Sequence, residues 1–325
     1  MRAMLCKEYG PPEMLRLEDV ASPKPGEGQV LVSVKACGIN FPDALIIENK
    51  YQFKPELPFS PGGEVSGIIT SLGSGVEGWS VGDEVIAFIL SGGLAEEVVV
   101  DTGKLIAKPA AMPFDEAAAF MLTYGTVLHA LEDRAALRAG ETLLVLGAAG
   151  GVGTAAIQIG KGMGAKVIAA TSSAAKNAYC LSQGADACID YASGDFRAEL
   201  KNLTSGRGVD VVFDPVGGPL AEAALRSTGW KGRYLVVGFA SGEIPSIPLN
   251  LVLLKGASLI GVFWGAFYDR EPENRQAHAA ALTALYDRGI AKPQVSAVYP
   301  LEQAGQAISD LRDRRATGKI VVSMA

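Results

Sequence analysis

The sequence predicts an α/β protein of two domains, one built from short β-strands and one from a parallel sheet covered by helices. Up to about residue 109, short strand-like runs alternate with turns rich in glycine and proline, a pattern typical of a barrel-like β unit. From about residue 115 onward strands and helices alternate, which predicts a doubly wound parallel sheet. A chain of 325 residues is long enough to bury two cores.

Strands of the first domain are predicted where apolar and polar residues alternate between turn residues. They cover residues 29–35, 64–70, 84–89 and 97–100. In the second domain, aliphatic runs predict strands at residues 141–146, 166–170, 187–190, 209–213, 233–237 and 259–262. Helices are predicted at residues 123–137, 154–163, 273–288 and 301–314. A last strand at residues 319–323 is expected to return to the first domain.

The most informative motif follows the strand at residues 141–146. Glycines stand at positions 147, 150 and 153, with a further glycine at 151, and a helix-forming segment begins near Thr154. Such a turn points the unpaired N–H groups of the helix outward, where they favour an anion. An ordinary turn of small residues is the alternative, but the strand–turn–helix–strand context favours a dinucleotide site. The phosphate-binding residues are predicted to be Gly147, Ala149, Gly150, Gly151, Val152 and Gly153.

The end of the next strand distinguishes two forms of the dinucleotide. A protein that uses NAD commonly has Asp or Glu there, which binds the ribose hydroxyls. This chain has hydroxyl side chains instead, at Thr171, Ser172 and Ser173. No carboxylate follows before Asp186, whereas Lys176 lies close by. Because hydroxyls and an ammonium group suit a 2′-phosphate, we predict NADPH as the cofactor. A solvated charge on the next helix is the alternative for Lys176.

Charge and hydropathy argue against two classes of partner. Acidic residues outnumber basic ones by 35 to 29, which gives a formal net charge of −6, so a nucleic-acid backbone or an anionic membrane is not the expected partner. The first residues lack the continuous apolar stretch of a signal peptide, and the apolar segment at residues 259–267 is too short to span a bilayer. We therefore expect a soluble, cytoplasmic protein.

The sequence offers few metal ligands. The four cysteines, Cys6, Cys37, Cys180 and Cys188, form no C-x-x-C pair, and the chain has only two histidines, His129 and His278. Zinc sites commonly need closely spaced cysteine and histidine ligands. We therefore predict no metal site and expect the cysteines to be buried apolar residues. His129, on an apolar helix, is expected in the core.

Five motifs carry a family resemblance. They are Ala36-Cys37-Gly38-Ile39-Asn40-Phe41-Pro42-Asp43, Pro61-Gly62-Gly63-Glu64-Val65-Ser66-Gly67, Gly82-Asp83-Glu84-Val85, the glycine turn, and Asp214-Pro215-Val216-Gly217-Gly218. With them the whole chain resembles the zinc-independent quinone oxidoreductase (zeta-crystallin-like) branch of the medium-chain dehydrogenase/reductase superfamily. The resemblance implies a GroES-like catalytic domain at residues 1–122, completed by 264–325, and a Rossmann NADP-binding domain at 123–263. It also implies a homodimer formed through the cofactor domains.

The comparison with zinc-dependent relatives bears on the chemistry. Those alcohol dehydrogenases have a cysteine ligand where Asn40 stands and a histidine ligand where Gly63 stands, and they usually carry a lobe of four cysteines. Without thiolate and imidazole ligands, no Lewis acid polarises a carbonyl group. The resemblance therefore implies hydride transfer to an acceptor that is already electrophilic, a quinone or an α,β-unsaturated carbonyl compound.

The resemblance also assigns catalytic roles. Asn40 is expected in the active-site cleft, hydrogen-bonded to cofactor or substrate, and capping of its own loop is the alternative. Tyr51 matches a tyrosine that some enoyl-thioester reductases use near the reacting carbon, either as a proton donor or to orient the substrate. An aromatic shelf is the alternative for Tyr51. The chain departs from the bacterial quinone oxidoreductase pattern at Leu45, where a tyrosine is often found.

Further cofactor contacts follow from the same resemblance. Thr126 is expected near the nicotinamide, with a bond to its own helix backbone as the alternative. Tyr191 is expected to flank the 2′-phosphate together with Lys176. Lys319 is expected to reach a cofactor phosphate from the returning tail, with a solvated lysine as the alternative. The nicotinamide half of the cleft is expected to be lined by Gly238, Phe239, Phe263 and Trp264.

Two other functions fit the same sequence. One is an enoyl-thioester (enoyl-CoA) reductase, whose cleft would also hold a phosphopantetheine arm. The other is a crystallin-like or regulatory NADPH-binding protein with little catalysis, because enzyme folds are sometimes reused in this way.

Overall fold

The structure is a computed structural model that describes residues 1–324. The chain divides into two compact units, unit 1 with residues 1–122 and 293 onward, and unit 2 with residues 123–292. In this division the chain returns to unit 1 at Pro293, whereas the resemblance implies a return at residue 264. Residues 264–292 belong to unit 2 because their aromatic side chains pack on the helical region at its start, Trp264 against Gly125 and Phe267 on the ring of His129.

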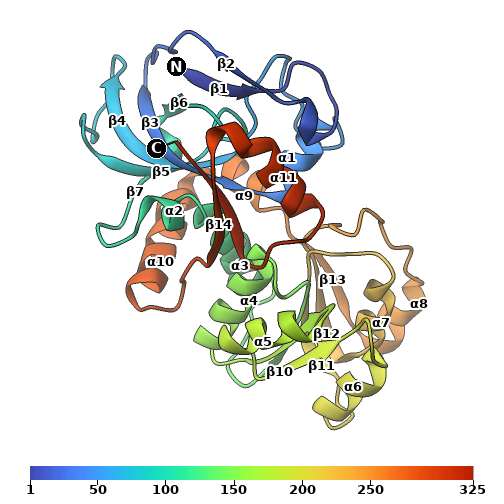
Figure 1. Cartoon of the computed structure of the whole chain (residues 1–325). Helices are drawn as coiled ribbons and strands as arrows, with labels where there is room; N and C mark the ends of the chain where they lie inside the picture. The colour runs from blue at the N-terminus through green and yellow to red at the C-terminus, as the bar shows by residue number, and fades with distance from the viewer. Residues whose placement is uncertain (325) are drawn as a thin grey trace. The chain divides into compact units, whose positions relative to one another are not determined.

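Unit 1 is built on a seven-stranded sheet whose strand order is β14-β15-β3-β4-β5-β7, with β6 also paired to β3 (Figure 1). All pairs in it are antiparallel except β14 with β15. The strands are β3 (Gln29–Ile39), β4 (Glu64–Leu72), β5 (Glu84–Phe88), β6 (Glu97–Asp101), β7 (Leu105–Ala107), β14 (Val295–Pro300) and β15 (Lys319–Ser323). A separate hairpin pairs β1 (Arg2–Leu5) with β2 (Arg16–Asp19). The predicted strands of the first domain are confirmed.

Strand β3 is longer than its sequence pattern predicts. It continues to Ile39 because β15 pairs with residues 36–39, while β6 pairs with residues 29–33. The last strand thus returns to unit 1, as expected. Valine and isoleucine side chains of these strands, such as Val32, Ile69 and Val322, form the core of the unit.

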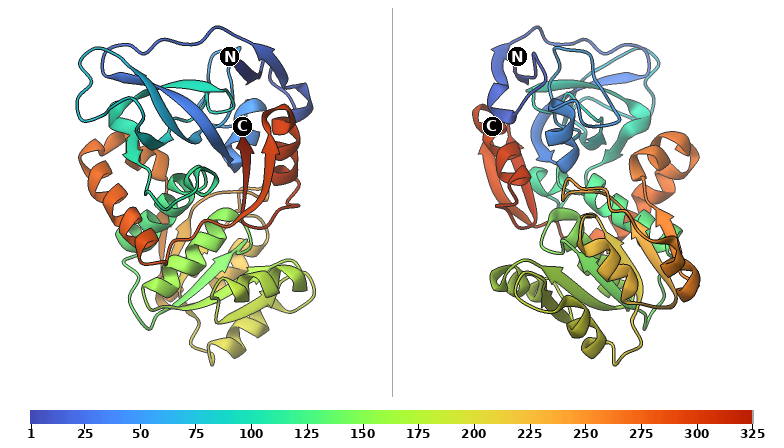
Figure 2. Two further views of the ribbon diagram at one scale, coloured as in Figure 1. Left: turned by 60° about the vertical axis from the view of Figure 1, so that its left-hand side comes forward. Right: turned by 90° about the vertical axis from the view of Figure 1, so that its right-hand side faces the viewer.

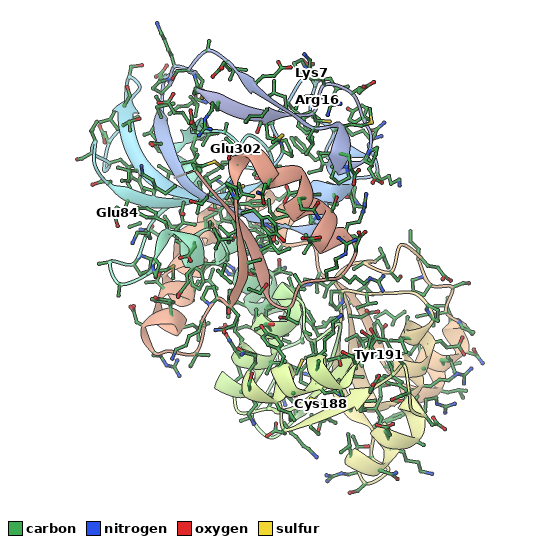
Figure 3. The ribbon with its side chains drawn as sticks, viewed as in Figure 1. Lys7, Arg16, Glu84, Cys188, Tyr191 and Glu302 are labelled. Atoms are coloured by element: carbon green, nitrogen blue, oxygen red, sulfur yellow. The ribbon has the colours of Figure 1, made fainter. Side chains whose placement is uncertain are left out.

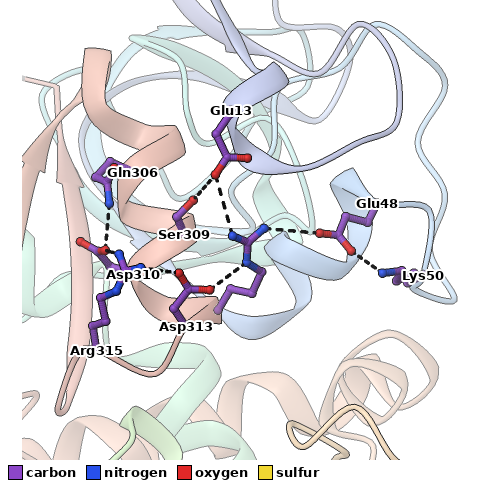
Figure 4. A network of polar contacts seen from close by, with 9 residues as sticks. Glu13, Glu48, Lys50, Gln306, Ser309, Asp310, Asp313 and Arg315 are labelled. Atoms are coloured by element: carbon purple, nitrogen blue, oxygen red, sulfur yellow. Dashed lines mark hydrogen bonds and ion pairs between the residues drawn. The ribbon is translucent and has the colours of Figure 1, made fainter.

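Helices of unit 1 are short. They are α1 (Phe41–Ile47), α2 (Phe114–Ala117) and α11 (Ala304–Arg312), with single turns η1 (Pro12–Met14), η2 (Thr102–Lys104) and η5 (Leu301–Gln303). Helix α11 buries Ala307 and Ile308 in the core. Arg312, at the end of this helix, lies 3.8 Å from the carboxylate of Glu13 and 3.7 Å from that of Glu48; Figure 4 labels both of these glutamates. These partly exposed ion pairs contribute little to stability individually.

Unit 2 contains a six-stranded sheet of order β10-β9-β8-β11-β12-β13, and every pair in it is parallel. The strands are β8 (Thr142–Leu146), β9 (Lys166–Thr171), β10 (Ala187–Asp190), β11 (Val209–Asp214), β12 (Thr228–Val236) and β13 (Ser258–Gly261). In chain order this is 3-2-1-4-5-6, so the predicted doubly wound sheet is confirmed. Ligands of such sheets bind at the carboxyl ends of the strands, where the order reverses.

Helices cover both faces of this sheet (Figure 2). The alternation of side chains along β8 explains why, since Leu144 and Leu146 pack on one face with α6, α7 and α8, while Leu143 faces Gly160 of α4 on the other. The helices are α4 (Gly151–Gly162), α5 (Ala174–Ser182), α6 (Phe196–Leu203), α7 (Leu220–Arg226) and α8 (Leu249–Lys255).

Two further helical regions precede and follow these elements. The helix predicted at residues 123–137 is α3 (Met121–Leu128) followed by a π-helical segment η3 (His129–Arg134). After β13 come α9 (Trp264–Arg270), the turn η4 (Pro272–Asn274) and α10 (Arg275–Asp287). Among the helices of residues 1–324, none has both the length and the apolarity needed to cross a bilayer.

Candidate functional site

The glycine turn connects β8 to α4 at the carboxyl end of the sheet. Gly147 has a positive φ of 58°, and Gly150 is the N-cap residue of α4, with no side-chain hydrogen bond to cap the helix. The N–H groups of the first helical turn therefore have no intrahelical partner. An uncapped N-terminus at this position suits a phosphate group.

The glycines of the turn have different tasks. A Cβ on Gly153 would lie 2.5 Å from the carbonyl oxygen of Gly147 and 2.6 Å from Cα of Ala148, so this position accepts no side chain. A Cβ on Gly150 would meet nothing closer than 3.5 Å. Gly153 is therefore needed for the turn itself, whereas Gly150 leaves space in front of the helix.

Hydroxyl groups gather at the end of β9. Thr171 Oγ1 donates to Asn177 Oδ1 at 2.7 Å, and the Ser173 hydroxyl accepts from the backbone N–H of Lys176 at 3.3 Å. Ser173 is thus the N-cap of α5, a role that the sequence prediction of a cofactor contact did not include. The backbone N–H of Tyr191 donates to the Thr171 carbonyl at 3.0 Å. This bond brings Tyr191, which follows β10 (Figure 3), to the same strand end as Ser172.

Asp214 organises the loops that follow β11 and β12. One carboxylate oxygen accepts the N–H groups of Val216 and Gly217, each at 2.8 Å, and the other accepts the hydroxyl of Tyr234 at 2.5 Å. The backbone N–H of Gly238 donates to the Asp214 carbonyl at 3.3 Å. Asp214 is buried. Its organising role was missed at the sequence level, although it opens one of the quoted motifs.

The residues expected near the nicotinamide differ in exposure. Phe239 and Phe263 are exposed, whereas Trp264 and Thr126 are buried within unit 2. The indole of Trp264 lies against Gly125, where a Cβ would come within 2.8 Å of the ring. The side chain of Trp264 therefore packs inside the unit, and only its backbone remains for a contact with a ligand.

In unit 1 a buried polar cluster joins three chain segments. Lys319 Nζ lies 2.6 Å from Asn40 Oδ1, 3.1 Å from the Ile39 carbonyl oxygen and 3.3 Å from Glu64 Oε2. Glu64 Oε1 accepts the backbone N–H of Leu122 at 2.8 Å. The side chain of Glu64 is fully buried and that of Lys319 is 5% exposed. The cluster is an ion pair in which every charged atom has a hydrogen-bond partner.

This cluster changes two expectations. The three donors of the Lys319 ammonium group are used within unit 1, so the expected contact with a cofactor phosphate has no donor left. Asn40 donates both amide hydrogens, to Gly38 O and Glu64 Oε2, each at 3.1 Å. Only a lone pair of Oδ1 remains for a cofactor or a substrate, and Asn40 also precedes α1 as its N-cap residue.

Asp43, in the first turn of α1, is a buried acid next to this cluster. Its carboxylate accepts the N–H of Asn40 at 2.7 Å and the N–H of Gly62 at 3.2 Å. Burial raises the pKa of Asp43 to about 7, despite these two bonds and the nearby charge of Lys319. The group therefore titrates near neutral pH.

We expect the protonation of Asp43 to make stability depend on pH. Because its folded-state pKa of about 7 exceeds its ordinary value of 3.8, its contribution is fully present below about pH 4 and is lost as the pH rises to about 7. Between these limits the free energy of unfolding should fall by at most about 1.4 kcal/mol per pH unit, relative to Asp43→Asn. Denaturant titrations of both proteins from about pH 4.5 to 7.5 measure this difference. Parallel profiles would contradict the assignment.

Tyr51 lies in unit 1, half-buried against the core. Burial raises the pKa of its phenol, with the charge of Asp43 adding to the effect. Its hydroxyl has no hydrogen-bond partner within residues 1–324. Tyr51 is therefore a protonated hydroxyl that is available to donate.

The remaining site predictions concern metal and thiols. Residues 1–324 contain no group of three or more His, Cys, Asp or Glu side chains that could hold a metal ion. Three of the four cysteines are buried, and Cys188 is half-buried. His129 is buried, as expected, and its ring bonds Asp133 at 2.7 Å.

Comparison with known proteins agrees with this architecture. The alcohol dehydrogenase GroES-like domain family matches residues 26–110, and the zinc-binding dehydrogenase family matches residues 151–281. A quinone oxidoreductase-like protein 2 homolog from Nematostella vectensis is 39% identical, over 99% of this chain and 88% of its own length. The chain belongs to the quinone oxidoreductase branch of the medium-chain dehydrogenase/reductase superfamily. It is an oxidoreductase.

Solved structures of this family resemble the chain over its full length. The Escherichia coli quinone oxidoreductase complexed with NADPH is 30% identical, with a TM-score of 0.93 over 99% of this chain and 100% of that one. A mycobacterial protein complexed with NADPH is 31% identical, with a TM-score of 0.93 and the same coverage.

Proposed function

We propose that this oxidoreductase transfers a hydride from NADPH to a quinone or an α,β-unsaturated carbonyl compound, without zinc. The observation that carries the proposal is the carboxyl edge of the unit 2 sheet. There the uncapped N-terminus of α4 follows β8, and the neighbouring strand β9 ends in residues that carry hydroxyl groups and no carboxylate. The NADPH in two related structures supports the same cofactor.

The residues of unit 2 fit this cofactor. The free N–H groups of Gly151, Val152 and Gly153 suit the pyrophosphate, and the space in front of Gly150 admits it. Ser172, Lys176 and Tyr191 would hold the 2′-phosphate. Thr126, Gly238, Phe239 and Phe263 would line the nicotinamide end. When bound, NADPH supplies the hydride, and the protein positions the two reactants.

We expect Lys176→Ala to weaken the binding of NADPH about tenfold, because the variant loses a charge-assisted bond to the 2′-phosphate. NADH, which lacks this phosphate, should bind the variant and the wild type equally. Calorimetric titration of both proteins with both dinucleotides measures the four affinities. Equal losses for NADPH and NADH would contradict the role of Lys176.

The donor set in unit 1 supports chemistry without zinc. Where related alcohol dehydrogenases have one zinc ligand, this chain has the amide side chain of Asn40. That amide donates to Glu64 and accepts from Lys319. The position of another is Gly63, which has no side chain. Acceptors that are already electrophilic need no Lewis acid, since incoming charge delocalises onto the carbonyl oxygen. The unpartnered hydroxyl of Tyr51 could then protonate the product.

Parallel assays test the substrate class. Oxidation of NADPH, followed at 340 nm, should be fast with 1,4-naphthoquinone or an α,β-unsaturated ketone and slow with crotonyl-CoA. Addition of a chelator should leave the rates unchanged. Turnover of crotonyl-CoA without turnover of the quinone would replace the proposal by an enoyl-thioester reductase. Binding of NADPH without any turnover would favour a crystallin-like or regulatory protein.

We also propose that two copies of the chain pair through unit 2. Strand β13 is an edge of the sheet, and the apolar side chains of Trp230, Leu253, Leu254 and Leu259 are exposed around it. An exposed edge with an apolar surface suits pairing with a second copy about a two-fold axis. Light scattering should give twice the 33.8 kDa of the chain. Leu259→Lys should give the monomer mass, and a monomeric wild type would reject the pairing.

A further inference from the structure

Both histidines of the chain lie in one aromatic cluster of unit 2, away from the polar groups assigned above. His278 of α10 and His129 of η3 are each 8% exposed. The ring of Phe267 stacks on His129 with centroids 4.2 Å apart and meets His278 edge-on at 5.5 Å. Trp264 completes the cluster, with its indole N–H 3.2 Å from Nε2 of His278.

The hydrogen bonds of His278 define its protonation. An indole N–H only donates, so Nε2 of His278 accepts and carries no proton. The ring also forms a hydrogen bond with the backbone of Gly125, and this bond raises the pKa of His278. A bond with this effect is one that the ring donates, so Nδ1–H donates to the Gly125 carbonyl. His278 is therefore a neutral imidazole with both nitrogens in use. Burial lowers its pKa, which agrees with the neutral form.

The two partners of His278 stand beside residues assigned to the nicotinamide end. Gly125 directly precedes Thr126, and Trp264 directly follows Phe263. Gly125 also lies so close to the indole that a Cβ would come within 2.8 Å of it. The imidazole thus links α3 and the start of α9, two segments that are far apart in the chain, at the point where both would meet the cofactor.

We propose that His278 is a positioning residue that fixes Thr126 and Phe263 relative to each other and thereby sets the affinity of unit 2 for the nicotinamide half of NADPH. The inference rests on the proposed function, because it takes the nicotinamide contacts from it. An apolar ring of similar size would fill the space of the imidazole but would join neither segment. It would also leave the buried indole N–H and the Gly125 carbonyl without these partners.

Substitution of His278 separates positioning from packing. His278→Phe should raise KM for NADPH about tenfold, the effect of losing buried hydrogen bonds, with a smaller change in kcat. His278→Gln, whose amide can accept from Trp264 and donate to Gly125, should restore KM to within about threefold of the wild-type value. Trp264→Phe combined with His278→Phe should be no worse than the single variants, because both break the same bond. A wild-type KM in His278→Phe would overturn the proposal.

The pH profile gives a second reading that remains informative if His278→Phe fails to fold. Protonation of His278 would direct an N–H at the indole N–H, so NADPH affinity should fall at acid pH in the wild type and stay level in His278→Gln. The other titratable groups around the cluster are His129 and Asp133 of η3, Tyr268 of α9 and Arg275 of α10. His129→Gln should keep the acid-side loss. If it abolished that loss, or if His278→Gln kept it, His278 would not be the group responsible.

A measurement without cofactor distinguishes failure of this proposal from failure of the proposed function. In a Trp79→Phe, Trp230→Phe background, Trp264 is the remaining tryptophan, since the chain has three. Its fluorescence should change at acid pH with His278 and stay constant with His278→Gln. If this change occurs and NADPH does not bind, the proposed function fails, but the link that His278 makes between Gly125 and Trp264 is supported. If NADPH binds and the fluorescence has the same pH dependence with His278 and with His278→Gln, the proposed role of His278 is rejected.

Discussion

Replacing Gly153 by alanine should abolish NADPH binding and strongly destabilise unit 2. The added methyl carbon would lie 2.5 Å from the carbonyl oxygen of Gly147 and 2.6 Å from both Cα and the carbonyl oxygen of Ala148. These are backbone atoms of the same turn, so relief requires α4 to move away from the end of β8. Overpacking of this kind costs about 1–3 kcal/mol or more. The displaced helix would also direct its free N–H groups away from the phosphate.

The matched control for this variant is Gly150→Ala. Gly150 has a φ of −81°, and its added Cβ would meet only the Gly147 oxygen, at 3.5 Å, so the fold should tolerate the methyl group. The methyl group would lie in the space in front of α4, so this variant should keep the wild-type melting temperature and lose NADPH affinity. Thermal unfolding and calorimetric titration of both variants separate the two effects. A Gly153→Ala protein with wild-type stability would contradict the account of the turn.

Removal of either charge from the buried pair of Glu64 and Lys319 should destabilise unit 1 by about 3–5 kcal/mol, the usual cost of an unpaired buried charge. Lys319→Met leaves the Glu64 carboxylate fully buried without its cation. Glu64→Gln leaves the ammonium group with neutral acceptors only, among them Asn40 Oδ1 and the Ile39 carbonyl. Denaturant unfolding measures both losses.

The double variant Glu64→Gln, Lys319→Met provides the control, because it removes both charges and keeps side chains of similar size. It should be more stable than the sum of the single losses predicts, by a coupling energy within the range of about 0.5–3 kcal/mol found for contacting residues. Additive losses would mean that the two charges do not act as a pair.

Local sequence patterns were sufficient for most of the fold. In β8 and β9, runs of buried aliphatic residues define the strand without help from distant segments. Strand β12 was predicted from residue 233, whereas it begins at Thr228, because its first half includes Lys231 at a φ of 60° and pairs irregularly with β11. The π-helical segment His129–Arg134 was not predicted for a different reason. Its residues favour a helix, but they do not determine whether the hydrogen bonds span four residues, as in an α-helix, or five, as in a π-helix.

The candidate site was harder to predict where its contacts join distant segments. The glycine turn is local, so its spacing could be read directly. The partners of Lys319 lie 255 and 279 residues away, and no pattern in the tail indicates that its ammonium group is consumed by Asn40 and Glu64. Ser173 shows a local form of the same difficulty, because one hydroxyl suits both a helix cap and a phosphate.

The pairing of β15 with residues 36–39 has a consequence for biosynthesis. The segment that completes unit 1 leaves the ribosome after the whole of unit 2, which is continuous in sequence and can fold earlier. Until residue 319 emerges, the carboxylate of Glu64 has no cation and one edge of β3 has no partner. Unit 1 therefore reaches its native state only after β15 has been synthesised and has paired with β3. A nascent chain stalled before this point should be a substrate for chaperones that bind exposed strand edges.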